Sequence, residues 1–239
     1  MREGYTDTIY KRIDESELKK DRKYLYSDLP YYYFKKYIEK KNKKPLEIAV
    51  QEHFYKQLGA YKLGYLPLER FSVDSIAPAE IEKTFRCQKI QGYVHDQGAA
   101  MLGGVGGHAG LFGTANDVAK MMQLYLQQGY YGGDWLLQPQ AVQLFNTCHY
   151  CNEGNRRGLG FDKPQLGKAG PTCGCTPMES FGHLGFTGTF AWADPVNEIV
   201  IVLLSNRTYP TADNKLLISR NIRQRVQGVV YSAMTKTEN

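Results

Sequence analysis

Residues 180–205 read SFGHLGFTGTFAWADPVNEIVIVLLS, a stretch in which apolar runs alternate with turn residues. Apolar and aromatic residues gather in three runs, at 180–184, 189–193 and 198–205, as they do in β-strands. The sequence Asp-Pro-Val-Asn at 194–197 separates the last two runs and has the composition of a tight turn. The stretch therefore predicts an antiparallel meander of three strands.

Helices are predicted on both sides of this meander. After it, apolar residues recur at helical spacing between Asn214 and Met234, and this face is expected to pack on the strands. Its members are Leu217, Ile218, Ile222, Val226, Val229 and Val230. Before the meander, Thr114 followed three residues later by Asp117 is a capping-box pattern, which predicts a helix start.

Two further helices are predicted near the start of the chain. Asp28 followed by Pro30 marks the first, whose expected apolar stripe is Leu29, Tyr33, Tyr37 and Ile38. The second begins near Pro45 and ends at Gly59. Residues 60–92 lack sustained periodicity and predict a long irregular connection. The chain thus begins with predicted helices and ends with a meander on which a helix packs. This order of elements indicates an α+β fold.

The charge of the chain is concentrated near its start. Residues 11–44 hold twelve Lys or Arg against six Asp or Glu, which accounts for the whole net charge of +6 over 239 residues. Lysines interleaved with tyrosines at 31–37 could follow a phosphate backbone, but a solvated helix face is the preferred interpretation, and no nucleic-acid partner is expected. We interpret residues 1–25 as a charged arm.

No apolar run reaches the roughly 20 residues that cross a bilayer, and no signal peptide is expected in this sequence.

Four of the five cysteines form two close pairs, Cys148 with Cys151 and Cys173 with Cys175. Structural zinc, disulfides and free thiols all remain open for these pairs, because the C-x-C spacing gives poorer chelate geometry than the usual C-x-x-C. His95 and His108 lack the spacing of a known metal motif, and we interpret each as structural.

Three segments together resemble the class C β-lactamase and esterase family, which includes D-alanyl-D-alanine carboxypeptidases. They are Tyr26-Ser27-Asp28, the glycine-rich stretch 103–114, and residues 181–189 with Trp192-Ala193-Asp194-Pro195 after them. The resemblance extends from about Tyr24 to Met234. It implies an incomplete β-lactamase/transpeptidase-like domain over residues 26–239, following the arm of residues 1–25.

The resemblance also implies roles for individual residues. Tyr26 matches the tyrosine of the family's Y-x-N motif, whose phenol helps move the proton of the nucleophile. Asp28 stands where asparagine is commonest and would contact substrate. His183-Leu184-Gly185 matches the K-T-G strand motif with histidine in place of lysine, so His183 is the second catalytic candidate, Gly185 lines the substrate site, and the backbone N–H of Phe186 would serve as an oxyanion donor.

The family's nucleophile motif, S-x-x-K, is matched in the chain only at Ser16-Glu17-Leu18-Lys19. We reject this match, because only ten positions separate Ser16 from Tyr26 and its neighbours are charged, whereas the family's serine begins a largely buried helix. The chain is therefore expected to begin after the nucleophile.

The resulting expectation is the C-terminal part of a serine hydrolase that acts on esters or amides through an acyl-enzyme, inactive by itself. Neither a cofactor nor a metal is expected, the substrate of the parent protein would be a small molecule or a cell-wall or glycan-type compound, and an extracytoplasmic location is expected for that parent. Two alternatives remain open: a non-catalytic module that binds peptide or glycan on the same fold, and a zinc-stapled interaction domain.

A last expectation concerns the edge of the sheet. The resemblance implies that strands from an N-terminal region would pair with the meander. An unpaired apolar edge, either 189–193 or 199–204, would then drive self-association or be covered by residues 1–25.

Overall fold

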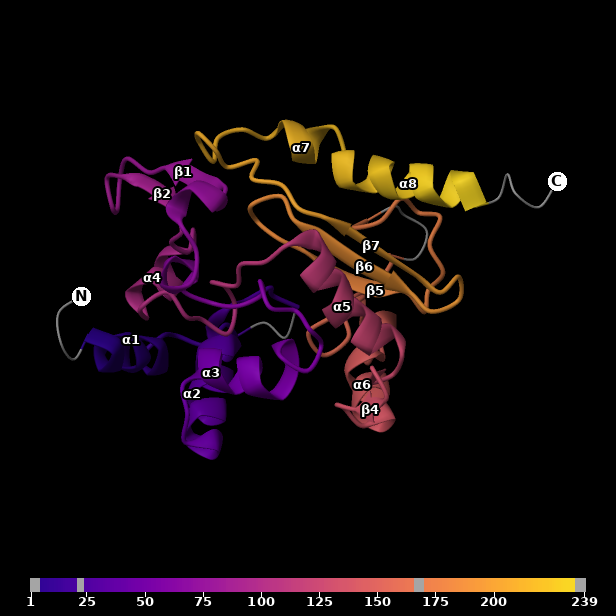
Figure 1. Ribbon diagram of the computed structural model, residues 1–239, viewed down its shortest axis with the longest axis horizontal. Helices are drawn as coiled ribbons and strands as arrows, with labels where there is room; N and C mark the ends of the chain where they lie inside the picture. Colours follow the sequence, from indigo (N-terminus) through magenta and orange to yellow (C-terminus); the bar gives the residue numbers. More distant parts are fainter. Residues whose placement is uncertain (1–4, 21–23, 166–169, 235–239) are drawn as a thin grey trace. The chain divides into compact units, whose positions relative to one another are not determined.

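The computed structural model describes residues 5–20, 24–165 and 170–234, and the chain divides into two compact units (Figure 1). The first unit combines Met1–Lys56 with Leu63–Phe112, and the second combines Gln57–Lys62 with Gly113–Asn239. Among the described residues, no helix is both long and apolar enough to span a bilayer.

The first unit is mainly helical. Its elements are α1 (Tyr5–Asp14), α2 (Leu29–Asn42), α3 (Leu46–Val50) running on into a π-helical turn η1 (Gln51–Tyr55), the short 3-10 turns η2 (Pro67–Glu69) and η3 (Val73–Ser75), β1 (Pro78–Ile81), β2 (Lys89–Gln91) and α4 (Gln97–Met101). The helix starts predicted at Asp28 and Pro45 are confirmed, since these residues are the N-caps of α2 and α3.

Two predictions for the first unit are wrong. Leu29, Tyr33 and Tyr37 are exposed, and α2 instead buries Tyr32, which is 8% exposed. Residues 60–92 are not wholly irregular, because β1 and β2 pair antiparallel within them. The charged segment before α2 also forms structure: α1 buries Tyr10, whose hydroxyl donates to the backbone oxygen of Tyr32 at 3.1 Å.

The second unit is built around a three-stranded antiparallel sheet. Its elements are α5 (Ala115–Leu126), β3 (Tyr130–Tyr131), β4 (Asp134–Trp135), α6 (Pro139–Asn146), a 3-10 turn η4 (Cys151–Glu153), β5 (Phe181–Leu184), β6 (Phe190–Asp194), β7 (Ile199–Leu203), α7 (Leu216–Ser219) and α8 (Ile222–Met234). The strand order β5-β6-β7 confirms the predicted meander, with register pairs such as His183 with Ala191 and Trp192 with Ile201.

One face of this sheet packs on α5, as Figure 1 shows. Thr114 caps α5 as predicted, its hydroxyl oxygen accepting a hydrogen bond from Asp117 N at 3.3 Å. Met122 of α5 forms a buried core with Phe181 and Ala193, and Phe161 and Val200 pack against them. Burial of these apolar side chains, worth about 1.5–3 kcal/mol for each one fully removed from water, fixes β5 against its neighbours.

The C-terminal helix differs from its prediction. The segment 214–234 is divided into α7 and α8, and Asn221 between them has a positive φ of 50°. The residues that α8 buries are Arg223, Gln227 and Tyr231, whereas Val229 of the predicted apolar face is 69% exposed. Side-chain hydrogen bonds from Arg223, Gln227 and Tyr231 therefore help to hold α8 against the sheet and its loops.

Candidate active site

The predicted residue His183 lies on β5, at the edge of the sheet, opposite Ala191 of β6. The glycines on either side of it are required by close packing. A Cβ atom on Gly182 would overlap the carbonyl oxygen of Ala191, and one on Gly185 would overlap the Thr189 hydroxyl. The pattern Gly-His-Leu-Gly thus positions the imidazole on a tightly paired strand.

Arg157, which the sequence analysis missed, contacts the imidazole of His183. Arg157 Nη1 lies 2.9 Å from His183 Nε2, and His183 Nδ1 lies 2.9 Å from the carbonyl oxygen of Leu184. A guanidinium can only donate, so His183 Nε2 accepts and Nδ1 carries the proton. His183 is therefore neutral in this arrangement, and Arg157 provides the positive charge beside it.

Asp162 positions this arginine. Its carboxylate, with the side chain 3% exposed, lies 2.9 Å from Arg156 Nε and 3.5 Å from Arg157 Nη2. The backbone of Asp162 exchanges two hydrogen bonds with Gly182 of β5, at 2.7 and 3.0 Å. The segment 156–162 is thereby aligned beside β5, and two arginines share one buried carboxylate. The two guanidinium groups carry two positive charges against the single negative charge of Asp162. The remaining positive charge favours recognition of an anion.

The loop after β5 holds the other two predicted residues of this unit. Gly185 O accepts a hydrogen bond from Arg223 Nη1 of α8 at 3.2 Å, and the Thr189 carbonyl accepts from the same nitrogen at 3.3 Å. Burial, together with the nearby Arg207, lowers the pKa of Arg223. Phe186 is 63% exposed, with the Arg207 guanidinium 4.7 Å from its ring centroid. The oxyanion role of the Phe186 N–H stays a prediction.

Tyr26 and Asp28 belong to the first unit. Tyr26 is 55% exposed and lies in an irregular segment that leads into α2. Asp28 is the N-cap residue of α2, although its side chain makes no capping hydrogen bond; the adjacent Ser27 hydroxyl accepts from Leu29 N at 3.2 Å instead. The substrate contact of Asp28 stays a prediction.

A partly buried polar cluster contains Tyr32, from the first turn of α2. The ring of Tyr32 stacks on His108 with centroids 4.5 Å apart, and His108 Nε2 lies 3.0 Å from Asp96 Oδ1. That hydrogen bond lowers the pKa of Asp96 against the opposing effect of its burial. Burial, then the carboxylates of Asp96 and Asp28, raise the pKa of Tyr32. The cluster fixes α2, and with it the segment that carries Tyr26.

The interpretation of His95 and His108 as structural residues agrees with their partners. His95 Nε2 lies 2.8 Å from Glu80 Oε2 of β1, just as His108 is bonded to Asp96. Within the described ranges, no group of three or more His, Cys, Asp and Glu side chains could hold a metal ion. Both cysteine pairs, Cys148–Cys151 and Cys173–Cys175, are disulfides.

The structure thus groups the predicted residues in two sets. Tyr26 and Asp28 lie together in the first unit, and His183, Gly185 and Phe186 lie together in the second. Arg157 and Asp162 also belong to the second set, because Arg157 contacts both His183 and Asp162. A signal for them existed in the sequence: two adjacent arginines are followed by a Gly-Leu-Gly turn and an acidic residue, all within 156–162.

Comparison with known proteins gives consistent matches. Residues 4–222 match the family model described as Beta-lactamase. A relative from Escherichia coli K12, named "Putative D-alanyl-D-alanine carboxypeptidase", is 34% identical over 224 residues, which cover 88% of this chain and 51% of the relative. The chain thus spans about half the length of the curated relatives it matches.

Solved structures share the fold at low sequence identity. A variant of simvastatin synthase from Aspergillus terreus matches with a TM-score of 0.64 at 15% identity, covering 97% of this chain and 61% of that one. A penicillin-binding protein homologue from Caulobacter crescentus matches with a TM-score of 0.51 at 20% identity, covering 75% of this chain and 51% of that one.

Proposed function

The chain belongs to the beta-lactamase family, and we propose that it carries part of the residue set of a serine acyl-hydrolase, with Tyr26 and His183 as its catalytic candidates. Substrate would be an ester or amide of the cell-wall peptide type, in keeping with the carboxypeptidase name of its relatives. Asp28, Gly185 and Phe186 would contact that substrate. The serine nucleophile would come from a segment outside these 239 residues.

The observation that carries this proposal is Arg157 beside His183 on β5. The family's K-T-G motif places a lysine cation at this position of the strand, and here the residue is a neutral histidine. Arg157 restores the cation, 2.9 Å from the imidazole. A guanidinium is a permanent cation that attracts carboxylates, so a peptide that ends in a free carboxylate is the substrate class that we propose for this site.

The position of Ser16 supports an external nucleophile. Ser16 follows the end of α1, is exposed, and donates its hydroxyl proton to the carbonyl oxygen of Ile13 at 2.6 Å. An S-x-x-K pair needs both residues on one helical turn, so that the lysine can accept the proton of the serine. Ser16 stands after a helix instead of at its start, and Lys19 lies in the exposed segment beyond it.

Labelling with a fluorophosphonate tests the proposal. The chain alone is expected to remain unlabelled and to hydrolyse neither p-nitrophenyl esters nor an acyl-D-alanyl-D-alanine peptide. Mixed with the part of the E. coli relative that the match does not cover, it is expected to yield label on the added segment and release D-alanine. Stoichiometric labelling of the chain alone, abolished in Ser16→Ala, would contradict the proposal. Peptide binding without turnover in the mixture would favour the non-catalytic module.

A further inference from the structure

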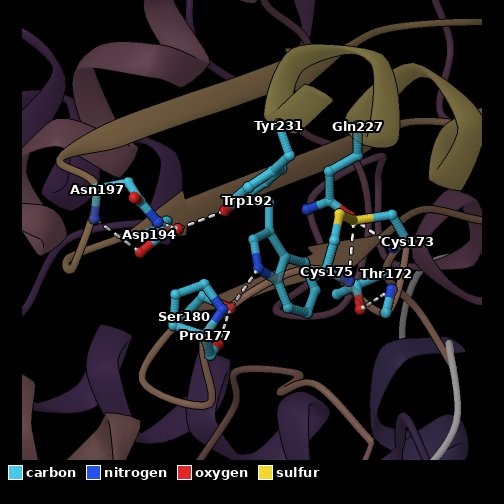
Figure 2. The surroundings of a disulfide bond; sticks show 11 residues. Thr172, Cys173, Cys175, Pro177, Ser180, Trp192, Asp194, Asn197, Gln227 and Tyr231 are labelled. Atoms are coloured by element: carbon cyan, nitrogen blue, oxygen red, sulfur yellow. Dashed lines mark hydrogen bonds between the residues drawn. A yellow bond between two sulfur atoms is a disulfide. The ribbon is translucent and has the colours of Figure 1, made fainter. Parts of the chain in front are cut away.

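The loop that precedes β5 contains a disulfide between two cysteines separated by one residue, Cys173 and Cys175 (Figure 2). A ring this small removes little conformational entropy from the unfolded chain, so the bond is a weak structural crosslink. The loop has other anchors. Cys173 N donates to the side-chain oxygen of the fully buried Gln227 at 2.9 Å, and Gly174 N donates to the hydroxyl of the fully buried Thr172 at 3.3 Å. These contacts do not depend on the S–S bond.

The two sulfur atoms have different surroundings. Cys175 is exposed, whereas Cys173 is half-buried and its Sγ lies 3.3 Å from the backbone N–H of Cys175. An N–H donor stabilises a thiolate relative to a thiol, and a sulfur whose thiolate is stabilised is the better leaving group. An incoming thiolate would therefore attack the accessible sulfur of Cys175 and expel Cys173.

A cavity of about 530 Å³ opens beside this disulfide. Cys173 lines it together with Asn221, Gln224 and Arg225, which lie on or just before α8. Arg225 is exposed and contributes a positive charge, and the two amide side chains contribute hydrogen-bond donors and acceptors. This lining suits a small polar molecule that carries carboxylates.

We propose that Cys173–Cys175 is a redox-active disulfide that exchanges with a small anionic thiol, which the positive charge of Arg225 draws to this loop and which reaches the exposed Cys175 from outside the cavity that Cys173 lines. The thiolate of the ligand attacks Cys175 Sγ, the Cys173–Cys175 bond breaks, and a mixed disulfide with Cys175 forms while Cys173 leaves as a thiolate. A second ligand thiolate then attacks the ligand sulfur of the mixed disulfide and releases Cys175 as a thiolate. The products are the reduced pair and the ligand's own disulfide, so two electrons pass from two thiols to the protein.

The probe for the experiment is glutathione, a tripeptide thiol with net negative charge, compared with the cationic thiol cysteamine. The protein is the full chain carrying Cys87→Ser, Cys148→Ser and Cys151→Ser, which retains the proposed site. Its matched control carries Cys87→Ser, Cys173→Ser and Cys175→Ser, which retains the other disulfide. Reactions are quenched by alkylation, and intact and peptide mass spectrometry locates each mixed disulfide.

Glutathione is expected to open the Cys173–Cys175 bond at least tenfold faster than the Cys148–Cys151 bond, with the mixed disulfide on Cys175. Arg225→Gln is expected to slow glutathione several-fold and to leave cysteamine unchanged. The control lacking both Cys173 and Cys175 is expected to melt within a few degrees of the parent. Equal opening rates for the two pairs, adducts on Cys173, an Arg225→Gln rate equal to the parent's, or unfolding of that control would each overturn the proposal.

Discussion

Arg157 Nη1 donates to His183 Nε2 across 2.9 Å, so the two residues act as one group in which the arginine holds the charge and the histidine holds a defined tautomer. The second imidazole nitrogen donates to the Leu184 carbonyl at 2.9 Å. An imidazole whose two ring nitrogens both take part in hydrogen bonds is a poor proton acceptor. We therefore expect His183 to form, with Arg157, the part of the site that binds an anion, and Tyr26 to carry the proton-transfer role.

The first prediction follows from this pair. Nitrogen NMR of the chain is expected to find His183 protonated at Nδ1, and Arg157→Gln is expected to shift the population toward protonation at Nε2, because the donor to Nε2 is weakened. Arg157→Lys, which keeps a donor, is expected to retain the Nδ1 tautomer. An unchanged tautomer in Arg157→Gln would show that the Leu184 carbonyl alone fixes the imidazole.

The meander was predictable because each of its strands is short, apolar and bounded by turn residues. Asp194 illustrates why the turn is reliable: its carboxylate accepts hydrogen bonds from Val196 N at 2.9 Å and Asn197 N at 3.1 Å, a local pattern written in consecutive residues. The capping of α5 by Thr114 is equally local. Such features need no knowledge of distant contacts.

The orientation of α8 and the Arg157–His183 pair were not predictable in the same way. Periodicity assigned the buried face of the last helix to leucine, isoleucine and valine residues, but Arg223 and Gln227 are buried because the Gly185 carbonyl and the Cys173 N–H lie opposite them. These partners are 38 and 54 residues away in sequence. A pattern within one helix carries no information about such partners, and the same holds for Arg157, which is 26 residues from His183.

A second prediction concerns Lys163, whose exposed fraction is 6%. Its Nζ donates to the Asn146 side-chain oxygen at 2.9 Å and the Glu179 carbonyl at 3.0 Å, and burial lowers its pKa to about 8. Between this value and the unfolded pKa of about 10.4, the unfolded chain binds more protons than the folded chain, so stability rises with pH in that window.

Urea unfolding at several pH values checks this effect. The free energy of unfolding of the parent is expected to gain on the order of 1–3 kcal/mol from this lysine between pH 8 and pH 10.5. Lys163→Met keeps the length of the side chain and removes the titrating group, so the difference between parent and variant isolates the effect from other groups. A difference that does not change with pH would contradict the lowered pKa.

A third prediction concerns Tyr231 of α8, whose hydroxyl donates to Asp194 Oδ2 at 2.5 Å (Figure 2). Asp194 is 1% exposed, and burial together with this carboxylate raises the pKa of Tyr231, which keeps its proton in place. Tyr231→Phe is expected to destabilise the chain by about 1–3 kcal/mol, because a buried carboxylate loses one of its donors. Urea denaturation measures the loss. In an Asp194→Asn background the same substitution is expected to cost less, and equal costs would show that the hydroxyl contributes only packing.

The last prediction concerns the edge of the sheet. Residues 189–193, one of the two edges considered from the sequence, are not an edge, because β6 lies between β5 and β7. The expected edge is therefore β7, whose five apolar residues Ile199–Leu203 are all half-buried. Among the described residues, β7 pairs with β6 alone. An apolar strand with one unpaired side is a template for another strand.

We therefore expect the isolated chain to self-associate through β7. Light scattering over a concentration series should give a rising mass, and hydrogen exchange should show β7 amides that exchange rapidly in dilute protein and become protected as the mass rises. Amides of β6, paired on both sides, serve as the internal control and should be protected at every concentration. A compact monomer at high concentration, with residues 1–25 resistant to proteolysis and β7 amides already protected, would contradict self-association and favour coverage of the edge by the N-terminal segment.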